Sequence, residues 1–524
     1  MVSGKSIARA ALIIMAATLL GRLLGFVRET VIAAEFGASM ATDAYKAAYN
    51  LPNILGFTIT GAFNAAFIPI FTQSLLEDNR ERTWRLASSV INIVLIFFIL
   101  ITLAGIFLAP WVVELTAPGF KGQVFTLTTE LMQIIFPTLI FMALAGITSG
   151  MLNSQQHFLL PSLGPIVAST GVIASVFLLV PTMGIYGLAV GTLVGFAGQF
   201  LVQVPQLYKQ GFRYHFCLDW RDPTISKMGK LILPVLIGVG VGQISIIVDQ
   251  RFASHLAEGS VAALNFAHRL MQLPLGLFVS ALAIPLFPAF SAYAAKNDLD
   301  SIKKTLVKGI NLYVLIMIPA TVGLMILSTP IVKLLFERGA FDAQDTEITA
   351  YALFFFSLGL IGFAVRDLFT RVFYALKDTT TPVVVAALAV ALNVVLNLYL
   401  VDRMGVGGLA LSTSIATFAN LVGQGWLLRR KIGSFLTPET WVTWVKVGIA
   451  SAVMAVAVWF IHWELAQLLT LGGTKGQLVL VGASILAGAL VYGILVFVLR
   501  IPEANYLINM VREKLNRKRA EEAK

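Results

Sequence analysis

The sequence predicts an all-α integral membrane protein: 14 transmembrane helices, in two parallel six-helix lobes around a central cavity, plus two extra C-terminal helices. The first observation behind this prediction is composition. The 524 residues are 58% hydrophobic and 12% charged, with a mean hydropathy of +0.84. An ordinary soluble domain carries about twice that charge, and its single core could not use so much apolar surface. The surplus is expected to face lipid. The other two observations are the distribution of basic residues and an internal repeat.

Each transmembrane helix needs about 20 mostly apolar residues. The predicted spans are 8–34, 43–74, 86–113, 127–152, 161–180, 184–208, 229–255, 261–294, 307–330, 348–372, 382–401, 405–428, 442–462 and 476–499. Spans 1, 7 and 10 carry charge, and spans 2 and 8 are weakly hydrophobic, as expected of helices that line a polar cavity. Arg22 and Arg28 interrupt the first apolar run, so we expect a retained helix instead of a cleaved signal peptide.

Basic residues set the predicted orientation. Most loop Lys and Arg residues fall on the side of the N-terminus, and the opposite loops hold only Lys121, Lys333, Arg338, Arg403 and Lys475. Cytoplasmic loops are the ones enriched in Lys and Arg, so both termini are expected in the cytoplasm of a bacterial inner membrane protein. The net charge of +11 is therefore attributed to the membrane, and no nucleic-acid partner is expected. The single cysteine, Cys217, excludes an internal disulfide.

An internal duplication relates the first six spans to the next six. Met183-Gly184-Ile185-Tyr186-Gly187-Leu188-Ala189 recurs as Met404-Gly405-Val406-Gly407-Gly408-Leu409-Ala410, at an offset of 221 residues. Pro161 recurs as Pro382, and Leu51-Pro52 as Leu273-Pro274. Because six is even, both halves have the same orientation, which predicts parallel repeats with a cavity between them. The predicted domains are 1–208 (first lobe), 209–430 (second lobe), 431–500 (two appended helices) and 501–524 (basic tail).

Charged residues inside the spans are the candidate binding site. Such charges cost at least a few kcal/mol near the bilayer centre, so they should face protein or a water-filled cavity. Both repeats place cations on their first two helices, and arginine suits phosphate because its planar fork donates two parallel hydrogen bonds. The alternatives are internal ion pairs, such as Arg28 with Asp43, or snorkelling near helix ends. The candidate substrate-binding residues are Arg22, Arg28, Glu29, Asp43, Lys46, Arg251 and Arg269.

A second polar group lies in the second half of the chain. Asn393 and Asn397 share one face of span 11, Thr413 lies on span 12, and Asp249 on span 7 supplies a carboxylate. One carboxylate with amide and hydroxyl oxygens makes a reasonable site for a hard cation. The alternative is hydrogen bonding between helices. No phosphate-binding glycine loop, catalytic triad or metal-ligand spacing is found, so neither an enzyme nor an ATP-driven pump is expected.

The first 70 residues also resemble a known family. The segment 20–29 (LGRLLGFVRE), the segment 36–45 (FGASMATDAY), and Leu51-Pro52-Asn53-Ile54-Leu55 are similar to the MurJ/MviN lipid II flippases. In the second half, Phe266-Ala267-His268-Arg269-Leu270 resembles the family's span 8. The likeness runs from about residue 7 to 500. It implies the multidrug/oligosaccharidyl-lipid/polysaccharide exporter superfamily.

The resemblance carries further expectations. It implies transfer of undecaprenyl-pyrophosphate-linked peptidoglycan precursor to the outer leaflet by alternating access, driven by membrane potential or a cation gradient. Lipid II, membrane lipids and cell-wall synthesis proteins are the implied partners, and no cofactor is implied beyond Na⁺. The family's cavity arginines fall on Arg22, Arg28 and Arg269. Its sodium site falls on Asp249, Asn393, Asn397, the Leu409 carbonyl and Thr413, and the two appended helices correspond to a groove for the lipid tail.

The chain departs from the family pattern at several of these places. Gly56, Phe57 and Thr60 stand where many relatives carry two arginines and an acid, and Asn397 stands where the sodium-binding relative has an acid. A less basic cavity and weaker sodium binding follow from these differences. The rival functions are a flippase for another polyprenyl-linked glycan, a cation-coupled multidrug exporter, and a scaffold with a transporter fold.

Overall fold

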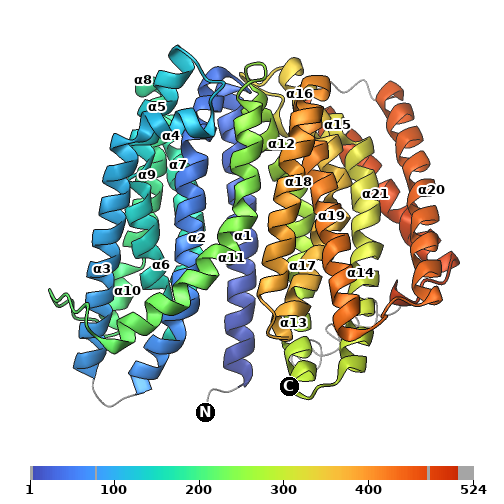
Figure 1. Ribbon diagram of the computed structural model, residues 1–524. Helices are drawn as coiled ribbons and strands as arrows, with labels where there is room; N and C mark the ends of the chain where they lie inside the picture. The colour runs from blue at the N-terminus through green and yellow to red at the C-terminus, as the bar shows by residue number, and fades with distance from the viewer. Residues whose placement is uncertain (1–3, 77–79, 469–472, 505–524) are drawn as a thin grey trace. The chain divides into compact units, whose positions relative to one another are not determined.

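The computed structural model describes residues 4–76, 80–468 and 473–504, and every regular element among them is a helix (Figure 1). Backbone contacts divide the chain into two compact units. Unit 1 comprises Met1–Asn265 with Arg338–Asp345, and unit 2 comprises Phe266–Glu337 with Thr346–Lys524. The predicted lobe boundary at residue 208 rests on the sequence repeat, so it stays a prediction. Residues 505–524 of the predicted basic tail lie outside the described residues.

The helices of unit 1 form a bundle in which α2 is central. It packs against α5, α6 and α11, while α7 packs against α1 and α9. The bounds are α1 (Gly4–Phe36), α2 (Met40–Leu76), α3 (Arg80–Phe107), α4 (Ala109–Thr116), α5 (Gln123–Ile135), α6 (Thr138–Ser154), α7 (Leu159–Leu178), α8 (Val180–Met183), α9 (Ile185–Leu201), α10 (Val204–Lys209) and α11 (Pro223–Ala253). Helix α12 (Ser260–Pro274) begins in unit 1 and continues into unit 2.

Unit 2 holds the remaining elements. The bounds are η1, a π-helix (Leu275–Val279), α13 (Ser280–Ala295), α14 (Leu299–Ile326), α15 (Ser328–Phe336), α16 (Ala343–Leu358), α17 (Leu360–Ala375), α18 (Thr380–Met404), α19 (Val406–Ile432), α20 (Pro438–Leu468) and α21 (Gly473–Val498). Helix α18 packs on α19, and the appended α20 packs on α14 and α21. Tyr492 of α21 donates a 2.6 Å hydrogen bond to the Leu315 carbonyl of α14, which ties both appended helices to the unit.

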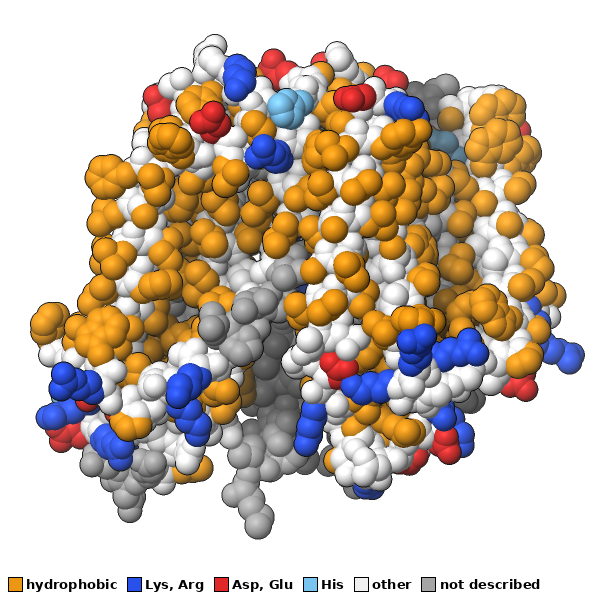
Figure 2. Space-filling model, viewed as in Figure 1, with side chains coloured by type: hydrophobic (Ala, Val, Ile, Leu, Met, Phe, Trp, Pro, Cys, Tyr) orange, Lys and Arg blue, Asp and Glu red, His pale blue; other side chains and the backbone are white. Residues whose placement is uncertain are grey.

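The membrane prediction is confirmed in its coarser form. Ten helices among the described residues are long and apolar enough to cross a membrane, or eleven if α16 and α17, which meet at a 43° bend, count as one span. Each of the 14 predicted spans falls on helical structure, but the count itself stays a prediction. On the face drawn in Figure 2, hydrophobic side chains cover the flanks of the helices in each unit.

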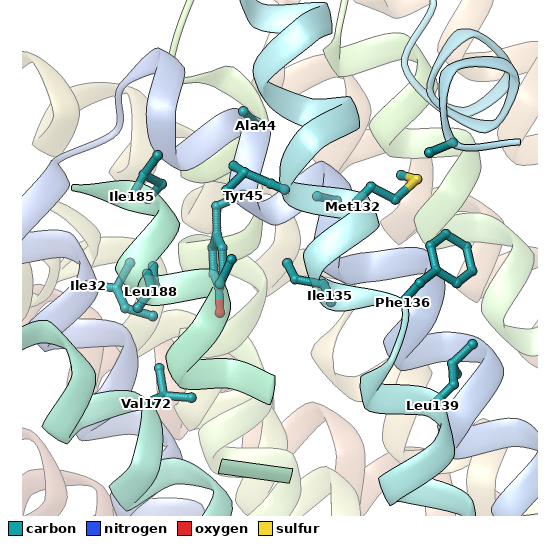
Figure 3. Close-up of a cluster of buried hydrophobic side chains, with 14 of the residues drawn as sticks. Ile32, Ala44, Tyr45, Met132, Ile135, Phe136, Leu139, Val172, Ile185 and Leu188 are labelled. Carbon is teal, nitrogen blue, oxygen red and sulfur yellow. The ribbon is translucent and has the colours of Figure 1, made fainter. Parts of the chain in front are cut away.

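The core of unit 1 is built where α1, α2, α5, α6, α7 and α9 meet. Ile32, Tyr45, Met132 and Leu188 are almost entirely buried there (Figure 3). Ala44 and Ala48 are also buried in this cluster, and small residues allow membrane helices to approach closely. This packing fixes the face of α2 that carries Asp43 and Lys46.

The sequence repeat recurs in the backbone as pairs of left-handed turn residues at the same offset. Gly184 and Gly405 have φ of 56° and 54°, and each caps the start of the next helix. Gln156 and Lys377 have φ of 63° and 60°. Both lie in the same C-terminal helix motif, in which the next residue's amide bonds back to a carbonyl five residues earlier, Leu152 and Phe373 respectively. Gly37 with Gly259, and Gly211 with Gly433, form two more such pairs. The duplication is therefore visible in local geometry as well as in sequence.

Candidate functional site

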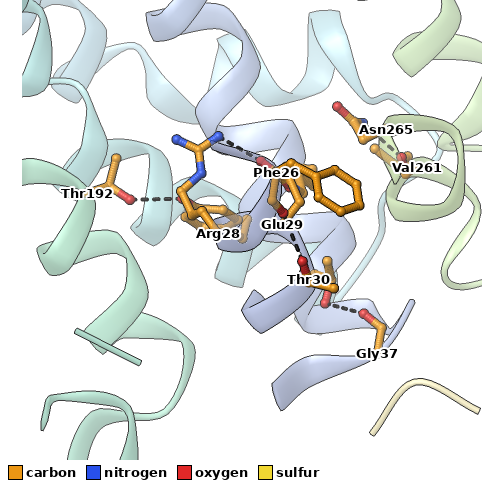
Figure 4. Close-up of polar contacts among 11 residues, drawn as sticks. Phe26, Arg28, Glu29, Thr30, Gly37, Thr192, Val261 and Asn265 are labelled. Atoms are coloured by element: carbon orange, nitrogen blue, oxygen red, sulfur yellow. Dashed lines mark hydrogen bonds and ion pairs between the residues drawn. The ribbon is translucent and has the colours of Figure 1, made fainter. Parts of the chain in front are cut away.

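Three charged residues of unit 1 form a buried cluster. The Arg28 guanidinium donates to Glu29 Oε1 at 2.7 Å, and the Lys46 ammonium bonds to Glu29 Oε2 (Figure 4). The side chains of these three residues are at most 13% exposed. Two cations and one carboxylate leave this cluster with a net positive charge. The structure thus brings together three of the predicted site residues, and it pairs Arg28 with Glu29 instead of Asp43.

Arg28 retains hydrogen-bonding capacity. Its Nε is buried and has no hydrogen-bond partner among the described residues. A buried N–H without a partner costs about 1–3 kcal/mol, so such a group needs an explanation. An incoming anionic oxygen is one explanation, because the guanidinium fork can donate from Nε and a terminal nitrogen in parallel.

Tyrosines and amides of α2 surround the cluster. The Arg28 guanidinium lies 6.0 Å from the Tyr49 ring centroid, and the Lys46 ammonium lies 5.9 Å from that of Tyr45. Tyr49 donates to Asn53 at 3.0 Å, and the Tyr45 and Thr192 hydroxyls lie 2.8 Å apart. These neighbours were not predicted from the sequence. Their signal is spacing, since Tyr45, Tyr49 and Asn53 recur every four residues along one helix.

Asp43 lies on the same helix but has different partners. Its carboxylate accepts hydrogen bonds from the backbone amides of Gly259 and Ala262, both at 2.7 Å, at the start of α12. Glu258, just before α12, accepts in turn from the Met40 amide at the start of α2. Carboxylates at helix N-termini satisfy amides that lack a partner within the helix and interact favourably with the dipole. Each of the two helices is therefore capped by an acid from the other's segment, and a role of Asp43 in substrate binding stays a prediction.

This capping makes Asp43→Asn a test of stability. An amide oxygen can replace one carboxylate oxygen, but the amide nitrogen would face a second N–H donor. Loss of one charge-assisted hydrogen bond is expected to lower the free energy of unfolding by about 1.5–3 kcal/mol. Thermal unfolding of the purified protein in detergent measures the effect. Glu35→Gln, an exposed carboxylate on α1, is the matched control, and an equal melting temperature for both variants would contradict the capping role.

The remaining predicted substrate residues are more dispersed. Arg22 lies on α1 and is exposed. Arg251 is exposed at the end of α11 and donates to the Leu115 carbonyl of α4. Arg269 of α12 belongs to unit 2, where it is partly buried and makes no hydrogen bond or ion pair among the described residues. Buried amides also join α2 to α11, through a 2.8 Å hydrogen bond between Asn50 and Gln250.

The predicted cation ligands of unit 2 lie together. Asn393 donates to the Thr413 hydroxyl at 3.2 Å, and Asn397 donates to Asn393 Oδ1 at 3.3 Å. Asn393, Asn397 and Leu409 are almost completely buried. Asp249, the only charged member of the predicted set, lies on α11 in unit 1. Among the described residues, no group of three or more His, Cys, Asp or Glu could hold a metal ion. The oxygen donors in unit 2 fit a hard cation chemically, and they also satisfy one another as interhelical hydrogen bonds.

The long apolar helices, the duplicated backbone and the buried basic cluster define a multi-pass membrane protein of the transporter class. The sequence profile described as "Lipid II flippase MurJ" matches residues 32–473. A probable lipid II flippase MurJ from Vibrio cholerae is 32% identical, with 94% of this chain and 97% of that protein covered. The lipid II flippase MurJ of Burkholderia cenocepacia is 31% identical, with 87% and 89% covered.

Solved structures agree. A structure described as lipid II flippase MurJ in an inward closed conformation is similar with a TM-score of 0.78 and 26% identity, covering 92% of this chain and 98% of that one. A multidrug resistance MATE transporter of the MOP superfamily shares the fold, with a TM-score of 0.66 and 15% identity, covering 81% and 98%. The chain belongs to the lipid II flippase MurJ family. It is therefore a transporter and not an enzyme.

Proposed function

We propose that this protein translocates lipid II, the undecaprenyl-pyrophosphate-linked peptidoglycan precursor, from the cytoplasmic to the outer leaflet of the bacterial inner membrane. The observation that carries the proposal is the Arg28–Glu29–Lys46 cluster, which is buried, net positive and retains a free Arg28 Nε. A pyrophosphate group is a strong acceptor for such donors. Family membership supplies the identity of the lipid.

Alternating access is the mechanism that we infer. Arg28 of unit 1 and Arg269 of unit 2 would bind the pyrophosphate, with Arg22 and Lys46 nearby, and the polyprenyl tail would stay in lipid beside α20 and α21. The termini would lie in the cytoplasm. Membrane potential or a cation gradient would supply the energy, since moving one charge across the membrane is worth about 2.3 kcal/mol per 100 mV.

The direct test is complementation of a lipid II flippase-depleted strain, followed by measurement of lipid II in the outer leaflet. Restored growth with restored outer-leaflet lipid II supports the proposal. A protein that restores growth without raising outer-leaflet lipid II would instead act as a scaffold. Restoration of transport for another polyprenyl-linked glycan, but not for lipid II, would move the proposal to that substrate.

A sodium ion is part of the proposal only as a weakly bound species. Asn393, Asn397, Thr413 and the Leu409 carbonyl would hold it with Asp249, and the ion would supply coupling energy or rigidity. We expect Asn397→Asp, which adds a negative charge, to strengthen sodium binding. The measurement is the difference in melting temperature between sodium and choline chloride, which should be larger for this variant than for the parent and absent in Asn393→Ala. An equal sodium effect in all three proteins would refute the site.

A further inference from the structure

The loop between α10 and α11 has a structure that the transport function does not use. Residues 213–221, here called the strap, run in extended form beside one end of α3 (Figure 1). The strap follows Phe212, which is buried against Trp84 with ring centroids 5.6 Å apart. It leads into Asp222, whose side chain accepts from Thr224 and caps α11.

Small polar side chains of α3 hold the backbone of the strap. Ser88 Oγ accepts from the His215 amide at 3.0 Å, and Ser89 Oγ accepts from the Asp219 amide at 2.8 Å. Asn92 donates to the Cys217 carbonyl at 2.8 Å. Lipid-exposed backbone without partners is not tolerated within a membrane. These bonds satisfy the strap's polar groups and allow it to lie against the bilayer without forming a helix.

The other face of the strap is apolar. Side chains alternate along an extended segment, and here every second one is large, hydrophobic and turned away from α3. Phe216 is 94% exposed, Trp220 55%, Tyr214 47% and Leu218 46%. A contiguous exposed patch of this kind marks an interaction surface.

The position on α3 places this patch at the membrane boundary. A 28-residue helix is about 42 Å long, and the hydrocarbon core is about 30 Å thick. About 12 Å of α3 must therefore project beyond the core. Ser88 and Asn92 lie in the second to fourth turns from its start, which is the headgroup level. Aromatic side chains such as those of the strap are enriched there.

Charge selects the kind of lipid. Basic residues lie within the strap and on both sides of it, and they outnumber the two acids, Asp219 and Asp222. The basic residues are Lys209, Arg213, Arg221, Lys227 and Lys230. Figure 2 shows hydrophobic and basic side chains side by side at the lower left, next to this end of α3. Basic segments beside a membrane are attracted to anionic lipids by about 1 kcal/mol per residue.

We propose that the strap is an interfacial membrane anchor, which inserts Phe216, Leu218 and Trp220 among the headgroups and binds anionic lipid phosphates through Arg213 and Arg221. It is the connector between the two sequence repeats, so the anchor fixes the depth of the junction about which the repeats are joined. The anchor is independent of the transported substrate.

Spin labels on the full-length protein in nanodiscs test the anchor. The chain has one cysteine, so Cys217→Ala provides the background. A nitroxide attached through Phe216→Cys should collide several-fold more often with lipid-soluble oxygen than with an aqueous nickel chelate. A label attached through Lys227→Cys, an exposed position on α11, should show the reverse. Equal access of the nickel chelate to both labels would overturn the proposal, as would immersion of position 216 only after addition of a soluble protein.

Lipid composition tests the electrostatic part. Nanodiscs of phosphatidylethanolamine alone are compared with nanodiscs that also contain phosphatidylglycerol. The label at position 216 should lie deeper with the anionic lipid. Arg213→Gln with Arg221→Gln should remove that difference, since each lost charge weakens attraction about fivefold. No dependence on lipid in the parent, or full dependence in the double variant, would overturn the role of the arginines.

Discussion

Replacing Arg28 by alanine is expected to abolish growth of a flippase-depleted strain that relies on this protein. The variant loses the guanidinium that contacts Glu29 and with it the free Nε. A hydrogen bond to a charged group contributes about 1.5–3 kcal/mol, so losing even one phosphate contact lowers binding about 10- to 150-fold. The measurement is growth together with outer-leaflet lipid II at matched protein levels.

Two matched variants separate binding from folding. Arg28→Lys keeps the charge but loses the fork, so partial transport is expected. Arg85→Ala removes an arginine whose side chain is 63% exposed and paired only with Glu81 on the surface of α3 among the described contacts. That variant should retain full activity. Unchanged transport in Arg28→Ala, with a normal elution profile in detergent, would remove the cluster from the proposed site.

Gly259→Ala is expected to lower the melting temperature of the protein severely. Gly259 has φ of 86°, and a Cβ built on it would lie 2.0 Å from the Ala38 carbonyl oxygen. The left-handed conformation costs a side chain about 1–2 kcal/mol. The overlap with backbone adds about 1–3 kcal/mol or more. Thermal unfolding of the purified variant in detergent measures the combined loss.

Gly122→Ala is the matched control for this effect. Gly122 also has positive φ, 58°, but a Cβ there would meet nothing within 4 Å. Only the conformational cost applies, so the loss should be about 1–2 kcal/mol. Similar melting temperatures for the two variants would mean that the turn before α12 can move away from Ala38 at little cost.

The helical membrane fold was predictable because it follows from composition and length. Runs of about 20 apolar residues are rare for any other reason, and the 221-residue repeat is legible in short motifs such as Met183-Gly184 and Met404-Gly405. The breaks inside helices were less predictable. Pro52 lies inside a continuous α2, whereas Pro274 ends α12 and is followed by a π-helix. Whether a proline interrupts a membrane helix depends on neighbours that re-satisfy the freed carbonyl, which sequence does not reveal.

The candidate site was predictable as a set of charges but not as a set of pairs. Arg28, Glu29 and Lys46 were all identified, since charge in an apolar span is conspicuous. Their pairing was not, because Glu29 is adjacent to Arg28 in sequence but reaches Lys46 only through the packing of α1 and α2. The backbone partners of Asp43 lie more than 200 residues away. Contacts between a side chain and distant backbone amides leave no residue-type signal.

The segment 338–345 has a consequence for biosynthesis. It belongs to unit 1, where the Ala340 amide bonds to the Ala34 carbonyl and Asp345 accepts from the Ala38 amide, 307 residues away in sequence. At about 5–20 residues per second, roughly 15–60 s separate synthesis of the α1–α2 turn from synthesis of its partner. During that interval the nascent first unit lacks both bonds. Chaperones or proteases at the membrane would therefore meet an incompletely closed turn on every newly made chain.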